Sequence, residues 1–488
     1  MRTVNLQTAK PRYRVTRRDF LKRAMLVGVT LSSGGTLLAA CRQEQPAASP
    51  AVTPAPPTPA AAATPAHAQT PQAGAAPVVT LDFTIWTFDR ESVQGYIDGW
   101  QQANGGKYTA RLSDIDWGQY HDTMVANFVA GNMPDIMYVS DHWLAEWASA
   151  GWLVPLKDVF PAEEVDKLAE GMFPYAIAGM TFEDQLYGLP YYADPIGFIY
   201  NTRHYREAGI TKDPETWDDV LEHARTIKQK GIAQYPIGFG WSQDEPFSIE
   251  VVTAMLMSRG EEFFDDNLDP TFLKPNSTLE QHIRWVKTAL DEGLMNPESL
   301  QRDGVADGQA MMAGVQTYGM TRASGMAQWQ TSTESAEAGN FKLIPNPGET
   351  HQTLGFVRFY GVTKKLAERD QAAKEAGWSF MYYFAGPGPK GDWPVVKAWV
   401  RKWGLGFGPM ELFQDPEVRE LFGKWTDVDV LEQIAKNARA RKLTPWYPSW
   451  DVFTRAELQR AYLGQVTVEE AIQNIADQWE QLRKEFEG

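Results

Sequence analysis

Three short segments rich in β-branched and aromatic residues alternate with two helix-like segments at the start of the folded part of this chain. The predicted strands are Val78–Trp86, Tyr108–Ile115 and Asp135–Val139, and the predicted helices between them are Ser92–Ala103 and Gln119–Ala130. Strands and helices that alternate at this spacing form βαβ units, whose strands lie parallel in one sheet. The sequence therefore predicts an α/β fold in which residues that follow the strands meet at one edge of the sheet.

Further helices are predicted along the rest of the chain. Thr216 is expected to cap one of them, because Asp219 stands at its third helical position and completes a capping box. This helix should reach Lys230, and the other predicted helices are Leu279–Glu292, Ala367–Phe384 and Val466–Phe486.

Length and composition exclude several classes of protein. The chain has 488 residues, which suggests two or three domains. A single cysteine excludes a disulfide framework and Cys-cluster metal sites, and no P-loop or paired histidines indicate a cofactor or metal, so we expect neither. A sequence pI near 5.0 argues against nucleic acid as a partner.

The first 40 residues have the pattern of an export signal. They hold eight Lys and Arg and one acid, although the whole chain carries a net charge of −16. Thr16–Lys22 matches the twin-arginine export motif, and Leu38–Cys41 resembles a bacterial lipobox. The stretch between them is too short and too rich in glycine for a membrane span. We therefore expect residues 1–40 to be a twin-arginine lipoprotein signal peptide and Cys41 to carry the lipid that anchors the protein outside the cytoplasm.

Residues 41–77 are predicted to be the lipidated cysteine and a tether. Residues 42–77 comprise 36 residues, of which 13 are Ala, 9 are Pro and none is aromatic. Such a composition buries too little apolar surface to fold, and its prolines favour an extended form. The body of the protein is expected to begin at Val78.

Several motifs occur in order along this body and together carry a resemblance. They are Gly131–Tyr138, Ala150–Leu156, Leu186–Tyr192, Ile199–Thr202, Ala208–Ile210 and Tyr462–Ala471. In this order they resemble the extracellular solute-binding proteins of ABC importers, in the maltose/oligosaccharide-binding branch. The resemblance covers nearly all of residues 78–488.

The resemblance implies a two-lobe, type II periplasmic-binding-protein-like α/β fold with the ligand cleft between the lobes. Residues 78–194 and 358–405 are expected to form lobe 1, and residues 195–357 and 406–488 lobe 2. The three crossover segments are expected near Asp194–Phe198, Gly355–Gly361 and Trp403–Pro409.

A sugar ligand needs aromatic rings for its flat C–H faces and charged or amide groups for its hydroxyls. Residues of these types that follow predicted strands, border the first crossover or stand in polar loops are therefore candidates for ligand contact. For Asp89 and Asp141 a helix-capping role is the alternative, and for the aromatic residues, core packing. The candidates are Trp86, Asp89, Asp141, His142, Tyr192, Asp194, Trp241, Glu245, Phe247, Ser324, Trp446, Tyr447 and Trp450, the last three in a segment expected to be an exposed aromatic cluster between prolines.

The predicted function is non-enzymatic capture of a mono- or oligosaccharide by hinge closure and its delivery to an ABC permease. The protein is expected to be a monomer that meets the membrane only through its lipid. An exported glycoside-active enzyme and a receptor-docking sensory protein for a non-sugar solute, such as a phosphorylated polyol, remain alternatives. The charge of the ligand stays open, because Arg322 and Arg358 stand near predicted cleft segments.

Overall fold

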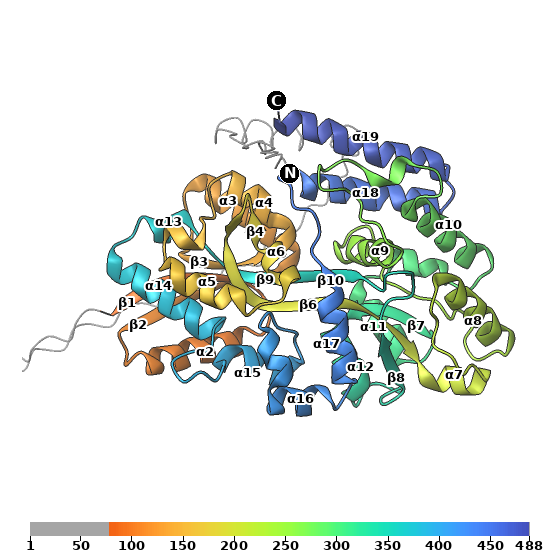
Figure 1. Cartoon of the computed structure of the whole chain (residues 1–488), viewed down its shortest axis with the longest axis horizontal. Helices are drawn as coiled ribbons and strands as arrows, with labels where there is room; N and C mark the ends of the chain where they lie inside the picture. Colours follow the sequence, from red (N-terminus) through yellow and green to blue (C-terminus); the bar gives the residue numbers. More distant parts are fainter. Residues whose placement is uncertain (1–77, 488) are drawn as a thin grey trace, which may run out of the picture. The chain divides into compact units, whose positions relative to one another are not determined.

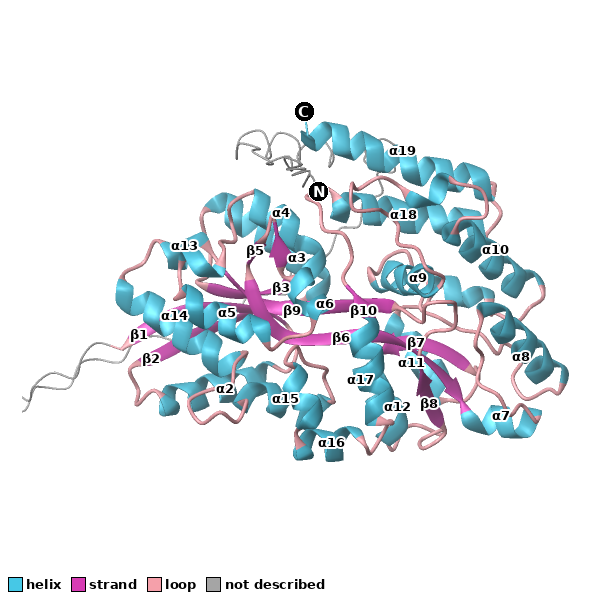
Figure 2. Ribbon diagram, in the orientation of Figure 1, coloured by secondary structure: helices cyan, strands magenta, loops and turns pink. Residues whose placement is uncertain are grey.

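A mixed β-sheet runs through the part of the chain that the computed structural model describes, residues 78–487 (Figures 1 and 2). Within these residues the sheet has eight strands in the order β2-β1-β3-β9-β6-β7, with β8 paired to β6 and β10 paired to β9. The predicted signal peptide, lipidation site and tether lie outside the described residues. The strands are β1 (Val79–Trp86), β2 (Tyr108–Ile115), β3 (Ile136–Ser140), β6 (Gly188–Asn201), β7 (Tyr318–Arg322), β8 (Phe341–Ile344), β9 (Thr353–Val362) and β10 (Ala438–Arg439), and a separate hairpin pairs β4 (Thr181–Phe182) with β5 (Gln185–Leu186).

The predicted parallel sheet is confirmed at the β1 end. β1 pairs in parallel with β2 on one side and with β3 on the other, and helices α2 (Arg90–Ala103) and α3 (Trp117–Ala130) connect them. Both helices begin two residues earlier than predicted. The side chains of Asp89 and Asp116 accept hydrogen bonds from the backbone N–H groups of Ser92 and Gly118, and so cap the first turns.

β6 and β9 are the two strands that connect the ends of the sheet. They lie side by side and antiparallel, and β9 also pairs antiparallel with β3. From Ile196 onward β6 pairs with β7 and β8 instead of β9, so the strand changes partners at Pro195. The chain therefore passes from one end of the sheet to the other within the two segments predicted as the first and second crossovers.

The third predicted crossover passes directly beside the first. Helix α15 (Pro394–Trp403) ends at Gly404, which has a left-handed backbone with φ 65°. Gly406 then lies so close to β6 that a Cβ atom at this position would stand 2.4 Å from the carbonyl oxygen of Ala193. Only glycine leaves room for the two backbones to approach this closely.

Helices cover both faces of the sheet and supply its core (Figure 1). Thr216 caps α8 (Trp217–Gln229) through the predicted capping box with Asp219. The predicted helix at 367–384 is two helices, α13 (Lys364–Ala367) and α14 (Gln371–Phe384), because Asp370 caps a new helix. The remaining α-helices are α4 (Leu144–Ser149), α5 (Ala162–Glu170), α6 (Pro174–Gly179), α7 (Thr202–Ala208), α9 (Phe247–Ser258), α10 (Thr278–Asp291), α11 (Gly304–Met312), α12 (Ala323–Thr331), α16 (Pro416–Phe422), α17 (Val428–Asn437), α18 (Tyr447–Tyr462) and α19 (Val468–Glu487).

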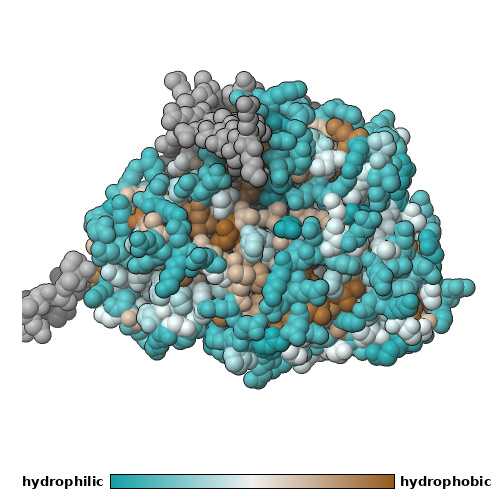
Figure 3. Space-filling view, viewed as in Figure 1, coloured by the Kyte–Doolittle hydropathy of each residue, from teal (hydrophilic) through white to brown (hydrophobic). Residues whose placement is uncertain are grey.

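Hydrophilic residues cover most of the visible surface, with smaller hydrophobic areas between them (Figure 3). Most large apolar side chains of the sheet and its helices are buried. Within residues 78–487 no helix has both the length and the hydropathy that crossing a membrane requires.

Replacing Gly406 by Ala tests the close approach of the crossover segments. The new methyl group would meet the backbone of Ala193, which cannot move aside without distorting β6. We expect Gly406→Ala to lower the free energy of unfolding by about 2 kcal/mol or more, measured by chemical denaturation. The matched control is Gly95→Ala in α2, where no atom lies within 4 Å of the new Cβ. This control should raise stability by about 0.5–1 kcal/mol, and equal effects at the two positions would contradict the steric argument.

Candidate functional site

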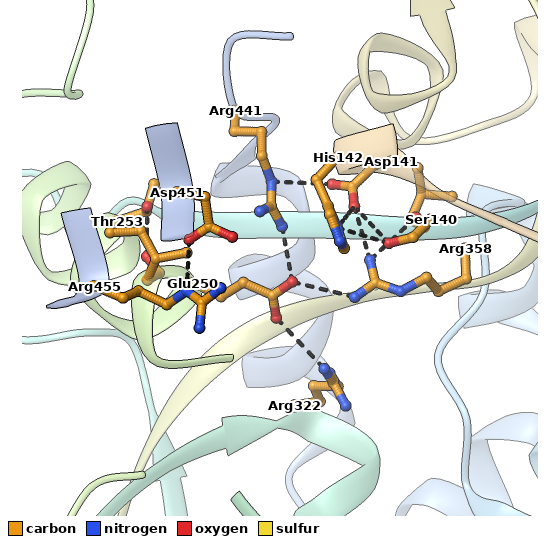
Figure 4. Close-up of polar contacts among 12 residues, drawn as sticks. Ser140, Asp141, His142, Glu250, Thr253, Arg322, Arg358, Arg441, Asp451 and Arg455 are labelled. Atoms are coloured by element: carbon orange, nitrogen blue, oxygen red, sulfur yellow. Dashed lines mark hydrogen bonds and ion pairs between the residues drawn. The ribbon is translucent and has the colours of Figure 1, made fainter. Parts of the chain in front are cut away.

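Two carboxylates and two guanidinium groups form a closed ring of ion pairs beside the crossing strands (Figure 4). Arg358 lies 2.7 Å from Asp141 and 3.2 Å from Glu250, and Arg441 lies 3.2 Å from Asp141 and 2.9 Å from Glu250. All four side chains are at most 3% exposed. We call these four residues the ion-pair ring. Arg322 joins it from outside, 3.4 Å from the second oxygen of Glu250.

The ring residues come from four separate parts of the fold. Asp141 begins the 3₁₀ turn that follows β3, and Arg358 is in the middle of β9. Glu250 belongs to α9, a helix in which every residue is buried, and Arg441 stands in the segment between β10 and α18. The ring therefore joins the turn after β3, the connecting strand β9, the helix α9 and the segment that leads into α18.

Electrostatics keep both carboxylates ionised. Burial alone would raise the pKa of Glu250, but Arg358, Arg441 and Arg322 together hold this pKa well below its usual range. Burial likewise opposes the ionisation of Asp141. Three interactions outweigh burial and lower the pKa of Asp141: the charge of Arg441, the hydrogen bond with His142 and the charge of Arg358. Burial lowers the pKa of His142 to about 4, so its imidazole is neutral at pH 7.

Aromatic rings surround the guanidinium groups. Arg358 lies over the rings of Trp117 and Phe356, at 5.9 Å and 4.8 Å from the ring centroids. Arg322 lies over Phe356 at 4.8 Å and over Phe247 at 5.2 Å. Arg322 and Trp117 are partly exposed, unlike the ring itself. The site thus combines fixed cationic donors, anionic acceptors and aromatic faces.

Several residues predicted from the sequence lie at or beside this cluster. Asp141 belongs to the ring, and the side chain of His142 lies 2.8 Å from the hydroxyl of Ser140 and 3.6 Å from the carboxylate of Asp141. Phe247 lies under Arg322, and Tyr447 lies under Arg441 at 5.8 Å. Burial raises the pKa of Glu245, just before α9, and the positive charge of Arg322 opposes this rise.

Tyr192 and Asp194 lie on β6 next to the first crossover, and Ser324 lies in α12 beside Asp194. The ring of Tyr192 meets that of Phe356 edge to face at 5.7 Å. The carboxylate of Asp194 accepts a hydrogen bond of 3.2 Å from the backbone N–H of Ser324. Burial raises the pKa of Asp194 to about 6, and this hydrogen bond opposes that rise.

Two predicted residues at the end of β1 have other partners. Asp89 caps α2 and also accepts bonds from Lys402, at 2.9 Å, and from the indole of Trp403, at 2.7 Å. Trp86 is 6% exposed and packs edge to face against Trp117 at 5.2 Å, behind the ring that faces Arg358. Trp86 therefore holds Trp117 in place by packing against it, and Asp89 has the capping role that the sequence left open.

The expected exposed cluster of Trp446, Tyr447 and Trp450 is not found, because these residues are 0%, 3% and 0% exposed. Unlike Tyr447, the two tryptophans pack their rings against Trp479 of α19, at 5.4 Å and 5.5 Å. Trp241 is 2% exposed and packs against His282 and Tyr462. The structure places these three rings in the core around α9, α10, α18 and α19 and does not bring them to the ion-pair ring.

Sequence reasoning did not single out Glu250, Arg441 or Trp117. A signal existed for Glu250, since it is the one charged residue in the segment Phe247–Ser258 and a buried charge needs partners. For Trp117 the signal was its place directly after the predicted strand Tyr108–Ile115. The partners themselves lie far away in the sequence and could not be inferred from it.

Asp141, His142 and Glu250 place one ligand-type atom each within 4.8 Å of one another. Both carboxylates, however, are paired with arginines that would repel a metal cation. The donor set therefore does not fit a metal ion, and the same groups suit a ligand with many hydrogen-bonding atoms.

The fold is that of the type II periplasmic binding proteins, with two α/β parts joined by crossing strands. The chain belongs to the family of bacterial extracellular solute-binding proteins, whose profile matches residues 89–391. Both the family and the fold class expected from the sequence motifs are thereby confirmed. The family binds substrates and is not a catalytic one.

Three similar proteins illustrate the family. An uncharacterized lipoprotein of Streptomyces antibioticus is 23% identical over 409 residues, which cover 82% of this chain and 86% of that protein. The maltotriose-binding protein of Pyrococcus abyssi is 24% identical over 300 residues, and the match spans 59% of this chain and 58% of that protein. The maltose-bound structure of T. maritima MalE3 superposes with a TM-score of 0.69 at 19% identity, covering 83% of this chain and 100% of that one.

Replacing Glu250 by Gln tests the ion-pair ring. The change leaves Arg358, Arg441 and Arg322 without their shared counter-charge in a buried site. We expect Glu250→Gln to lower the free energy of unfolding by about 3–5 kcal/mol. Glu469→Gln is the control, because Glu469 also pairs with an arginine on a helix but is 69% exposed. Its effect should stay below about 1 kcal/mol in the same urea titration, and a similar loss for both variants would refute the role of the ring.

Replacing Asp194 by Asn tests the raised pKa at the crossover. Folding favours the protonated form of Asp194, because its pKa is higher in the folded than in the unfolded chain. The stability that this protonated carboxyl group contributes is therefore fully present below about pH 4 and is lost as the pH rises through about 6. Asn cannot ionise but still accepts the bond from Ser324. We expect Asp194→Asn to be more stable than the wild type at pH 8, by about 2 kcal/mol, and the gap to close toward pH 4.

Asp213 supplies a control of opposite sign for this measurement. Its hydrogen bonds to Lys342 and Tyr200 outweigh burial and lower its pKa, and its side chain is 42% exposed. Asp213→Asn should therefore lose a little stability above pH 4. A stability gap for Asp194→Asn that does not change between pH 4 and pH 8 would show that Asp194 does not titrate as described.

Proposed function

We propose that this protein is the substrate-binding lipoprotein of an ABC importer, and that it captures a carbohydrate and delivers it to a membrane permease. The observation that carries the proposal is the ion-pair ring with its aromatic surroundings at the crossing strands. Guanidinium and carboxylate groups can bond sugar hydroxyls, and aromatic faces can stack on sugar rings. Relatives named for maltotriose, mannitol and lactose binding support this class of ligand.

Capture requires the parts around the ring to move apart. The ring side chains are at most 3% exposed, so a solute reaches them only after such an opening. We place the hinge at the β6–β9 pair and beside Gly406, where all three crossover segments lie together. Residues 78–194 and 358–405 then form one lobe, and residues 195–357 and 406–488 form the other. Ligand hydroxyls replace part of the ion-pair contacts when the lobes close again.

We assign direct ligand contact to Trp117, Arg322 and the ring residues. Tyr192, Phe247 and Tyr447 complete the aromatic lining, and His142, Asp194, Glu245 and Ser324 position their neighbours. Since Arg322 is 33% exposed and pairs with Glu250 through one nitrogen at 3.4 Å, it keeps donors available to a ligand. A partly anionic sugar derivative is therefore compatible with this site.

The N-terminal sequence supports export and anchoring. The twin-arginine motif at 16–22 and the lipobox that ends at Cys41 imply export of the folded protein and attachment of lipid to Cys41. A lipoprotein among the relatives agrees with an anchored, extracytoplasmic protein. We propose that the protein acts there as a monomer and touches the membrane only through this lipid and its permease.

Tryptophan fluorescence tests the proposal. The purified protein is titrated first with mono- and oligosaccharides and then with glycerol phosphate, and the ligand is recovered and analysed afterwards. A saturable change at micromolar concentration with the sugar recovered intact is the expected result. A sugar that is cleaved would favour the glycoside-active enzyme. A response to glycerol phosphate alone would favour the non-sugar alternative.

Replacing Trp117 by Ala tests the stacking surface. Removal of a partly exposed ring beside Arg358 should weaken sugar binding about tenfold or more, measured by calorimetry, with little change in stability. Trp378→Ala is the control, because this tryptophan is also partly exposed but lies on α14, away from the ring. An unchanged affinity in Trp117→Ala would remove Trp117 from the site.

A further inference from the structure

The four contacts of the ion-pair ring differ in length. Arg358 lies 2.7 Å from Asp141, and Arg441 lies 2.9 Å from Glu250. The two remaining contacts, each between a residue of one pair and a residue of the other, are both 3.2 Å long. In the proposed lobes each short pair belongs to one lobe, and the two longer contacts are those between the lobes. The ring can therefore separate into two pairs of opposite charges when the lobes part.

The two halves of the separated ring are not equally balanced in charge. Asp141 and Arg358 neutralise each other. Glu250, however, is shared between Arg441 and Arg322, which lies 3.4 Å from its second oxygen. Once Asp141 has moved away, two guanidinium groups depend on one carboxylate. A buried charge without a partner is strongly unfavourable, so a further carboxylate on the same lobe is needed.

Arg322 and Arg441 differ in how their charges are stabilised. The charge of Arg322 interacts with that of Glu245, and its side chain is 33% exposed to water. The side chain of Arg441 is only 3% exposed. The guanidinium of Arg441 is therefore the group that needs a second carboxylate when Asp141 moves away.

Asp451 places a carboxylate on the other side of Arg441. Figure 4 shows the guanidinium of Arg441 between the carboxylates of Asp141 and Asp451. Asp451 lies in α18, is 3% exposed and accepts a hydrogen bond of 2.9 Å from Nε of Arg455. Burial raises the pKa of Asp451, and the charges of Arg455 and Arg441 oppose this rise. The charges of Asp451 and Arg441 thus already attract each other.

Neighbouring residues on α18 support this arrangement. Tyr447, one turn before Asp451, lies under the guanidinium of Arg441 at 5.8 Å. Arg455, one turn after Asp451, also donates to the backbone carbonyl of Gln243. Asp451 can therefore turn toward Arg441 without leaving Arg455 unpaired. All five residues belong to the same proposed lobe, so these contacts persist when the lobes part.

We propose that Asp451 is a positioning residue for solute binding: when the lobes part, its carboxylate takes the place of Asp141 beside Arg441. The guanidinium then keeps its position in the open cleft, and the solute meets a donor that is already oriented. This inference rests on the proposed capture of a solute by hinge motion. It adds the specific claim that the open form depends on Asp451.

Inter-lobe distances in the ligand-free full chain test this claim. Nitroxide labels are placed at two exposed positions, Ala126→Cys in α3 and Leu463→Cys after α18, in a Cys41→Ser background. Double electron–electron resonance gives the ratio of the open form, with the longer distance, to the closed form. We expect Asp451→Asn to lower this ratio about fivefold, because Arg441 loses its partner in the open form.

Arg455→Gln is a test of opposite sign. The change leaves Asp451 without its partner in the closed form and free to pair with Arg441 in the open form. The ratio of open to closed form should therefore rise about fivefold. A merely structural role of α18 would not shift the ratio in opposite directions. Asp451→Glu keeps the charge and should leave the ratio within about twofold of the parent chain.

Two controls separate the charge of Asp451 from general effects on the helix. Glu457 is also a buried acid of α18 that pairs with an arginine, Arg460, but it does not belong to the ion-pair ring. Glu457→Gln should therefore keep the ratio of the parent chain. Asp451→Asn added to Arg441→Gln should change the ratio no further, because Asp451 acts through Arg441.

The outcomes separate this inference from the proposed function. A ratio that Asp451→Asn does not lower, or lowers equally in the Arg441→Gln background, would overturn the role of Asp451. Solute binding in the fluorescence titration would then still stand. A single short distance in both the parent chain and Arg455→Gln would overturn the opening itself.

Discussion

Two buried carboxylates and two buried guanidinium groups neutralise one another where the long strands of the sheet cross. Each of these charges would be strongly unfavourable in the interior by itself, and each makes contact with both groups of opposite charge. Their carriers are the turn after β3, the strand β9, the helix α9 and the segment after β10. The arrangement of these four elements is thus tied to one electrostatic requirement, and any motion of one against another must exchange these contacts for new ones.

The same requirement explains why this place suits a binding site. Charged groups held in fixed positions and shielded from water bond polar atoms without first reorganising. The aromatic residues that flank Arg358 and Arg322 exclude water from one side and offer flat surfaces on the other. Solute-binding proteins that close around a ligand need this combination of groups. The ligand has to stabilise the closed state, and the two parts have to separate again when no ligand is bound.

Close packing brings the crossover segments together beside β6. Gly406 lets the third crossover touch β6, so the three connections bend at one place.

The local sequence determined most of the elements and the residues that follow β3, and the resemblance to a family supplied the expected crossover positions. β1, β2 and α8 could be predicted because strand periodicity and a capping box depend on neighbours a few residues away. Asp141 and Tyr192 could be proposed from their places after a strand and at a crossover. Only the tertiary structure decided that Glu250 meets Arg358 and Arg441, more than a hundred residues along the chain. It also decided that Trp446 and Trp450 pack against α19 instead of facing solvent. Burial and charge pairing arise from segments distant in sequence, and no local pattern contains that information.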